Sequence, residues 1–210
     1  MITVYHLTSS RSERIVWLME ELGLDYELER FQREQGGAAP EAMKGIHALG
    51  RAPVIRDGDT VLAESGAIVD YIVHRHGAGR LAVAPQAPEY ARYVYWLHFA
   101  EGSLMTLALI ALVISRIPDA NASPAGLRVG ARLKQMLAFV DAELAQSPYF
   151  AGADFTAADV MMPFPFTTMR LFLDYDLAPY PNIVAYVKRI EARPAYGRAM
   201  AAIAPAAASR

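Results

Sequence analysis

The order of hydrophobic and polar positions makes the first third of the chain a mixture of strands and helices. Residues 2–7 are rich in β-branched and aromatic side chains, which predicts a strand. Apolar residues then recur at helical spacing from Ile15 until Gly23, a residue that commonly ends a helix. Apolar and charged residues alternate over 26–31, which predicts a second strand. The chain therefore begins as a strand, a helix and a strand.

A hairpin and a helix are expected next. Asp57-Gly58 is a hairpin turn signal, and strand patterns flank it at 53–55 and 60–62. The pattern from Glu64 to Arg75 predicts a helix, whereas residues 41–46 support at most a short, weak one. The expected order is β-α-β-(α)-β-β-α, with an antiparallel hairpin near its end.

The remainder of the chain reads as helical. Residues 76–88 contain two glycines, two prolines and several alanines, and no convincing strand pattern follows them. Thr156 and Asp159 have the spacing of a capping box, with Asp in place of the usual Glu. Helices are expected at 89–117 (one helix, or two joined at a bend near Gly102), 124–145, 156 to about 172, 181–193 and from 194. We therefore expect an α/β domain at 1–76, a linker at 77–88 and an all-helical domain at 89–210.

Composition narrows the possible functions. The chain has 210 residues and is 54% hydrophobic, which is enough for a substantial core. Its net charge is -2 with no basic block, so no nucleic-acid partner is expected. The absence of cysteine removes disulfides, thiolate metal sites and a cysteine nucleophile, and it fits a reducing cytoplasm. The five histidines form no metal pattern. The apolar run 104–117 is shorter than the roughly 20 residues of a membrane span, so no membrane partner is expected.

Two short motifs carry the chemistry. Pro53 stands at the start of a short apolar strand, and it forces Ala52 into an extended shape whose backbone can bond another chain. Glu64-Ser65 opens a helix, where unpaired N–H groups and the helix dipole attract a carboxylate. An extended backbone edge beside such a helix start suits a small peptide with a free carboxylate.

These motifs resemble those of the cytosolic glutathione transferases, in the same order and over nearly the whole chain. Residues 50–54 resemble the family's turn into a cis-proline strand, Glu64-Ser65 resembles its γ-glutamyl site, and 155–159 resembles the capping motif of its helical domain. Residues 9–14 resemble the serine-type bacterial branch of the family. The resemblance implies a thioredoxin-like α/β domain followed by an all-α helical bundle. Gly66 and His47 depart from residues that some members carry, which leaves the end of the site that binds the glycine of glutathione open.

The resemblance also implies roles for single residues. Ser10 aligns with the serine whose hydroxyl points at the glutathione sulfur. Ser9 and Tyr5 are the alternates, and Ser10 could instead simply cap the first helix. A hydroxyl in this place needs only to donate its proton to the sulfur.

Further residues are expected to hold the two substrates. The backbone of Ala52, ahead of Pro53, should pair with the cysteinyl part of glutathione, Glu64 with its γ-glutamyl amino group, and Ser65 with its α-carboxylate. Arg51 is a candidate for the glycine carboxylate, or an ordinary exposed arginine. The family places the electrophile between the domains, beside the long helix after the linker. Its candidate residues there, which could equally be core residues, are Tyr95, His98 and Met105.

The function implied is conjugation of glutathione, as co-substrate and without a metal, to small hydrophobic electrophiles. The same resemblance implies a homodimer and a detoxifying role. Two alternatives stay open: a glutathione-dependent isomerase or peroxidase on the same scaffold, and a binding module that keeps the fold without the activity. The sequence does not identify the electrophile.

Overall fold

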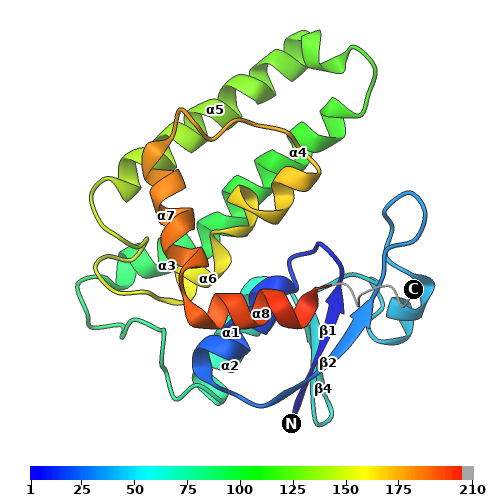
Figure 1. The fold of residues 1–210 in the computed structure, drawn as a ribbon, viewed down its shortest axis with the longest axis vertical. Helices are drawn as coiled ribbons and strands as arrows, with labels where there is room; N and C mark the ends of the chain where they lie inside the picture. Colours follow the sequence, from blue (N-terminus) through cyan, green and yellow to red (C-terminus); the bar gives the residue numbers. More distant parts are fainter. Residues whose placement is uncertain (205–210) are drawn as a thin grey trace. The chain divides into compact units, whose positions relative to one another are not determined.

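A four-stranded mixed sheet organises the N-terminal part of the computed structural model, which describes residues 1–204 (Figure 1). Its strands lie in the order β2-β1-β3-β4. β1 runs parallel to β2 and antiparallel to β3, and β3 forms a hairpin with β4. The strand bounds are β1 (Ile2–Leu7), β2 (Tyr26–Phe31), β3 (Val54–Asp57) and β4 (Thr60–Ala63). The strands expected at 2–7 and 26–31 are thus confirmed, as is the hairpin.

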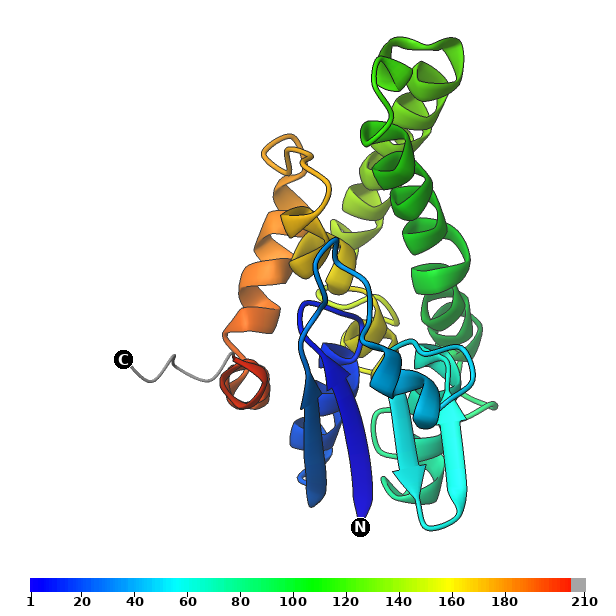
Figure 2. The same ribbon diagram turned by 90° about the vertical axis from the view of Figure 1, so that its right-hand side faces the viewer.

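Two helices pack on one side of this sheet (Figure 2). They are α1 (Glu13–Leu22) and α2 (Ser65–Arg75), and a short 3₁₀ helix, η1 (Glu41–Gly45), lies between β2 and β3 in the sequence. Helix α1 ends at Gly23, which adopts a left-handed conformation with φ +60°. Glycine adopts this conformation with little steric cost, which is why it commonly ends a helix. The apolar face of each helix is fully buried.

A helix from the far end of the chain completes this part. The contacts divide the chain into a first unit, Met1–Arg80 together with the chain from Glu191 onward, and a second unit, Leu81–Ile190. Within the first unit, α8 (Pro194–Ile203) packs on α1. The rings of Trp17 and Tyr196 meet edge to face with centroids 5.1 Å apart. The contacts place α8 with the first unit and start the second at Leu81, whereas the sequence predicts one helical domain over 89–210 after a linker at 77–88.

Ion pairs reinforce the α1–α8 contact. Arg193 donates from Nε and Nη2 to the two carboxylate oxygens of Glu21 at 2.6 and 2.8 Å. Trp17 donates to the same carboxylate at 2.9 Å. Arg198 bonds Glu20 at 2.7 Å. A bidentate arginine–carboxylate pair fixes orientation as well as adding energy, so it sets the register of α8 on α1.

Over residues 81–190 the second unit consists of helices and the loops between them, with no strand. Its core is rich in aromatic side chains, with the Trp96 and Phe150 rings 4.7 Å apart and the Phe150 and Tyr186 rings 4.9 Å apart. Its elements are α3 (Tyr90–Phe99), the π-helical segment η2 (Ala100–Met105), α4 (Thr106–Ser115), η3 (Ala120–Ala122), α5 (Pro124–Leu144), α6 (Ala157–Met161), η4 (Phe164–Phe166), η5 (Thr168–Leu171) and α7 (Pro181–Glu191).

Two expectations about these helices need correction. The bend expected near Gly102 is a π-helical segment, which widens the helix without breaking it. The helix expected from 156 to about 172 ends at Met161 and is followed by the two short 3₁₀ turns η4 and η5. Pro163 and Pro165 explain this ending, because proline lacks the N–H that an α-helix needs and its ring clashes with the preceding turn.

The apolar stretch of the second unit is longer in the structure than in the sequence pattern. Tyr90–Ser115 forms a continuous helical segment of 26 residues with a mean hydropathy of 1.9 in its most apolar window, of which 33% is buried. Length and composition alone would allow it to cross a membrane, and they fit the packed helix of a globular protein equally well. Arg92 lies in this segment and pairs with Glu143 of α5 at 2.8 Å.

Candidate functional site

The candidate glutathione residues meet at one edge of the sheet because of the strand register. Tyr5 of β1 lies opposite Val54 of β3, which lies opposite Ala63 of β4. The end of β1, the start of β3 and the end of β4 therefore share an edge. The loop to α1 leaves from this edge, Ala52-Pro53 arrives at it, and Glu64 leads from it into α2. Segments far apart in the sequence are thus brought together at the starts of two helices.

The Thr8–Ser12 loop holds Ser10 in a defined place. Ser9 has φ +52°, a left-handed conformation that is uncommon outside glycine. Arg33 donates to the carbonyl oxygens of Thr8 and Ser9, both at 2.9 Å, and so fixes the loop from outside. Ser10 is 6% exposed, and the amide of Glu13, the first residue of α1, donates to its carbonyl at 3.1 Å. Its hydroxyl therefore lies at the amino end of a helix, where an anion is favoured.

A buried hydrogen-bond network runs inward from Ser10. The hydroxyl oxygens of Ser10 and Ser12 lie 2.7 Å apart, and the Ser12 hydroxyl oxygen lies 2.8 Å from His6 Nδ1. His6 and Ser12 are 1% and 0% exposed. Burial lowers the pKa of His6 to about 4, with a smaller contribution from the positive charge of Arg30. His6 is therefore neutral at physiological pH.

Capping and donation are compatible roles for Ser10. Its oxygen accepts the Ser12 amide N–H at 3.3 Å, which is a local bond at the helix start. That bond uses a lone pair and not the hydroxyl proton, so the proton can still be donated elsewhere. The alternates are placed differently. Ser9 is half-buried beside Ser10, and the Tyr5 hydroxyl, on a side chain that is 6% exposed, accepts a hydrogen bond from Arg56 Nε at 3.1 Å.

The proline motif has the geometry that its resemblance implied. The Ala52–Pro53 peptide bond is cis, and Pro53 directly precedes β3. Ala52 is half-buried, Pro53 is buried and Arg51 is exposed. Gly50 has φ +56°, and a Cβ there would approach the Lys44 side chain to 2.7 Å, so this turn requires glycine. The arrangement presents the Ala52 backbone at the sheet edge.

Glu64 occupies an unusual backbone conformation. Its φ is +74°, in the region that side chains rarely adopt, and such strain costs about 1–3 kcal/mol and is common at binding sites. In the described part of the chain, its side chain makes no capping bond to α2, whose first helical bond runs from the Ile68 amide to the Glu64 carbonyl. Ser65 is buried at 4% exposure at the start of the helix. Glu64 thus places an exposed carboxylate one residue before the first amide of α2.

The candidate electrophile residues are scattered along the first long helix of the second unit. Tyr95 is 49% exposed, and His98 is also exposed. Tyr95 stacks on Phe99 at 5.5 Å and lines a groove of about 620 Å³ together with residues of α4 and α5. Met105, at 1% exposure, is a core residue in the π-helical segment.

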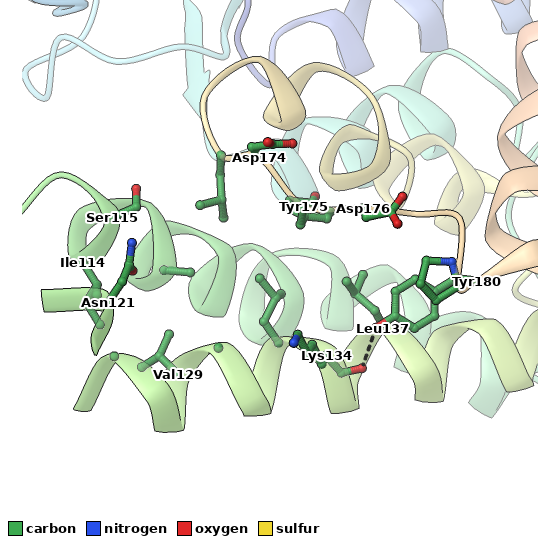
Figure 3. Close-up of a pocket in the computed structure, with 16 residues that line it drawn as sticks. Ile114, Ser115, Asn121, Val129, Lys134, Leu137, Asp174, Tyr175, Asp176 and Tyr180 are labelled. Atoms are coloured by element: carbon green, nitrogen blue, oxygen red, sulfur yellow. Dashed lines mark hydrogen bonds between the residues drawn. The ribbon is translucent and has the colours of Figure 1, made fainter. Parts of the chain in front are cut away.

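The structure shows a second cavity in this unit, which no sequence pattern predicted. It measures about 850 Å³ and lies between α4, α5 and the loop at 173–180 (Figure 3). Figure 3 shows Asp174, Tyr175 and Asp176 on that loop, across the cavity from Val129 and Lys134 of α5, and the Tyr180 hydroxyl donates to the Lys134 carbonyl at 3.3 Å. The candidate glutathione residues belong to the first unit, so none of them lines this cavity.

Sequence reasoning assigned no individual role to three residues of the candidate site: His6, Ser12 and Arg33. The alternation of β1 places His6 on one face of the strand with Val4, and the helix start places Ser12 near it. Only the fold shows that these two positions meet. Among residues 1–204, no group of three or more His, Asp or Glu side chains is arranged to hold a metal ion.

Comparison with known proteins agrees with this geometry. Residues 1–74 match the model of the glutathione S-transferase N-terminal domain, and residues 104–194 match that of the C-terminal domain. Glutathione S-transferase 3 of Schizosaccharomyces pombe is 34% identical over 210 residues, covering 93% of this chain and 85% of its own.

Solved structures agree as well. A glutathione S-transferase from Actinobacillus pleuropneumoniae superimposes with a TM-score of 0.88 at 36% identity, covering 97% of this chain and 93% of its own. A sphingomonad glutathione S-transferase complexed with glutathione is 26% identical with a TM-score of 0.74, covering 97% of this chain and all (100%) of its own. With both domains matched in order over most of its length, this chain belongs to the glutathione S-transferase family.

Proposed function

We propose that this enzyme binds glutathione at the sheet edge of its first unit, holds the thiol as a thiolate through Ser10, and transfers it to small hydrophobic electrophiles. One observation carries the proposal: the Ser10 hydroxyl lies at the amino end of α1, at the sheet edge shared with cis-Pro53 and the start of α2. Membership of the family and the homologue complexed with glutathione support the choice of co-substrate.

The groups at this edge suit the parts of a glutathione molecule. The Ala52 backbone would pair with the cysteinyl residue as an added strand, because cis-Pro53 leaves it extended at the edge. Glu64 would hold the γ-glutamyl ammonium group, and Ser65 with the first amides of α2 would hold the neighbouring carboxylate. Arg51 is exposed and would reach the glycine carboxylate.

The energies are of the right size for thiol activation. A free thiol has a pKa near 8.5, and lowering it by about two pH units requires roughly 2.7 kcal/mol of preference for the anion. A hydrogen bond to a charged group contributes about 1.5–3 kcal/mol. The amino end of a helix adds up to about 1 kcal/mol. One serine hydroxyl and the start of α1 together therefore suffice, without a general base.

The test is a titration of glutathione bound to the enzyme, followed by thiolate ultraviolet absorbance against pH. The wild type should ionise bound glutathione well below pH 8.5. Ser10→Ala should raise that pKa and lower kcat with little change in the Kd for glutathione, while Ser9→Ala serves as the matched control. If Ser10→Ala leaves both the pKa and kcat unchanged, Ser9 or Tyr5 takes its place. A protein that does not bind glutathione would support the binding-module alternative.

The electrophile is assigned by class only. Tyr95 and His98 are exposed on α3 and would contribute an aromatic surface for a small hydrophobic substrate, whereas Met105 is buried and would not contact it directly. A panel of electrophiles, isomerisable substrates and peroxides, each assayed with glutathione, separates conjugation from isomerase and peroxidase activity. Faster turnover of a peroxide or an isomerisable substrate than of any conjugation substrate would favour the alternative.

A cytoplasmic homodimer with a detoxifying role completes the proposal. Four apolar side chains of α4 and α5 are 37–60% exposed, namely Leu109, Ile110, Val113 and Phe139. Covering them against a second copy would remove this apolar surface from water. Sedimentation should show a dimer for the wild type and a monomer for Ile110→Glu; a monomeric wild type would remove the dimer from the proposal.

A further inference from the structure

The hydrogen-bonding capacity of the Ser12 hydroxyl allows two arrangements of its bonds to Ser10 and His6. A hydroxyl carries one proton and two lone pairs. The Leu7 amide donates to the Ser12 oxygen at 3.2 Å and fills one lone pair. Ser10 at 2.7 Å and His6 Nδ1 at 2.8 Å compete for the other lone pair and the proton, and the Leu7 carbonyl at 3.4 Å is a weaker acceptor. Therefore one of Ser10 and His6 donates to Ser12, and the other accepts from it.

The two arrangements have opposite consequences for Ser10. If His6 carries its proton on Nδ1, it donates to Ser12, and Ser12 donates to Ser10. The Ser10 oxygen then accepts from both the Ser12 hydroxyl and the Ser12 amide, so both its lone pairs are filled and only its proton remains to be given. If His6 carries its proton on Nε2, the two side-chain bonds reverse while the amide bonds stay as they are: Ser10 donates its proton to Ser12, and Ser12 donates to His6 Nδ1.

We propose that His6 and Ser12 are positioning residues, which act through the Nδ1–H form of His6 to present the Ser10 hydroxyl as a hydrogen-bond donor to the glutathione sulfur. This inference rests on the proposed role of Ser10. Neither residue touches the substrate, because both are almost completely buried. No general base is needed in this arrangement. Three hydrogen bonds in series, from His6 to Ser12, from Ser12 to Ser10 and from Ser10 to the sulfur, all point the same way.

Burial prevents His6 from acting as the acceptor of the thiol proton. A base whose pKa is lowered to about 4 does not take a proton from a thiol, whose free pKa is near 8.5. The thiol proton therefore leaves to solvent, while His6 stays neutral and only the direction of its hydrogen bond matters. Arg30, which lies opposite His6 in the β1–β2 register, contributes to the same neutral state.

The first test observes the tautomer directly in the folded wild type, by nitrogen NMR of ¹⁵N-histidine-labelled protein with and without glutathione. The His6 signal is identified by its loss in His6→Asn. The expected result is a neutral ring protonated at Nδ1. A ring protonated at Nε2 in the glutathione complex would overturn the proposal, and this measurement does not depend on any variant being active.

The second test uses a pair of variants at position 6. His6→Phe removes the donor, whereas His6→Asn places an amide N–H near the position of Nδ1. We expect His6→Phe to raise the pKa of bound glutathione by about one pH unit, as the loss of one ordinary hydrogen bond predicts. The value of kcat should fall, while the KM for glutathione stays within about twofold. His6→Asn should restore the wild-type pKa. Val4→Ala, a packing change on the same face of β1, should leave it unchanged.

The outcomes separate this inference from the proposed function. If Ser10→Ala raises the pKa of bound glutathione but His6→Phe does not, Ser10 keeps its role and the positioning network is refuted. A shift in His6→Phe that His6→Asn fails to restore, or that Val4→Ala reproduces, would mean that packing and not hydrogen-bond direction is responsible. An unchanged pKa in Ser10→Ala would remove the proposed role of Ser10 itself.

Discussion

Asp159 and Tyr186 are joined in the core of the second unit, where the tyrosine hydroxyl donates to the Asp159 carboxylate at 3.2 Å. The same carboxylate accepts the amide of Phe150 at 3.0 Å and, as part of a capping box, the amide of Thr156 at 2.9 Å. Both Asp159 and Tyr186 are 0% exposed. One buried carboxylate thus connects α6, α7 and the loop between α5 and α6.

Replacing Asp159 by asparagine should destabilise the protein by about 2–4 kcal/mol at pH 7. The amide would present an N–H₂ group where a backbone N–H donates now, and each unsatisfied buried group costs about 1–3 kcal/mol. Chemical unfolding measures the change. Asp154→Asn is the matched control, because Asp154 is exposed in the same loop, and it should change stability by less than about 0.5 kcal/mol.

The pH dependence of stability should change in a defined direction in Asp159→Asn. Burial raises the pKa of Asp159 to about 6, against the opposing effect of its four hydrogen bonds. A raised carboxyl pKa means that the folded state binds more protons than the unfolded state between about pH 4 and 6. Asp159 therefore contributes stability below pH 4 that is lost as the pH rises through 6, about 3 kcal/mol in all. The wild type minus variant difference in unfolding free energy should fall over this range; a flat difference contradicts the prediction.

His6 should make the stability of the protein depend on pH in the opposite direction to Asp159. Its pKa is lowered to about 4 in the folded protein, so the unfolded state binds more protons between pH 4 and 6.5. Stability should therefore rise with pH over this window by about 3 kcal/mol from this group alone. Unfolding of wild type and His6→Asn at pH 4.5, 5.5 and 7 should show this component only in the wild type. Equal pH profiles for the two proteins would contradict the lowered pKa.

The backbone conformation of Glu64 should lower the stability of the protein, while its carboxylate strengthens glutathione binding. Glu64→Gln keeps the strained φ of +74° and removes the charge, whereas Glu64→Gly removes both. We expect both variants to raise the Kd for glutathione by about tenfold, the effect of losing one charge-assisted hydrogen bond. Glu64→Gly should be more stable than Glu64→Gln by about 1 kcal/mol, since glycine adopts this conformation without strain. Calorimetric binding and thermal unfolding measure the two effects, and equal melting temperatures would mean that the site stores no strain.

The Glu21–Arg193 pair should depend on geometry more than on charge. Arg193→Lys keeps the positive charge but cannot form the two parallel bonds to Glu21. It should destabilise the first unit by about 1 kcal/mol, and Arg193→Ala by about 2 kcal/mol. Arg189→Lys is a control on the neighbouring helix, where the arginine makes a single bond to the Pro148 carbonyl. Equal stabilities of wild type and Arg193→Lys would mean that charge alone holds the contact.

Local sequence signals predicted much of the fold. The strands at 2–7 and 26–31 carry their own periodicity, Gly23 ends α1 as expected, and Thr156 with Asp159 forms the expected capping box. Each of these depends on residues within one turn or one strand of each other. The helix after Thr156 was predicted too long because its apolar pattern continues through Pro163, and the missing N–H of proline ended it.

The interior of the site could not be predicted in the same way. Ser10 and Glu64-Ser65 stand in recognisable motifs, and the fold brings both to one sheet edge. The bond between His6 and Ser12 joins a strand face to a helix start across a loop. Its existence depends on the angle between β1 and α1, which no periodicity encodes. The packing of α8 on α1 has the same origin, since partners 179 positions apart carry no common signal in one sequence.

The place of α8 also bears on how the protein is made. Domains of a nascent chain generally fold in order of synthesis, the first one first. Here the first unit includes residues 194–203, so the α1 surface around Trp17 stays uncovered until those residues have left the ribosome. The second unit, contained within 81–190, has no such delay. The half of the protein that is synthesised first thus completes its packing only after its last helix has been made.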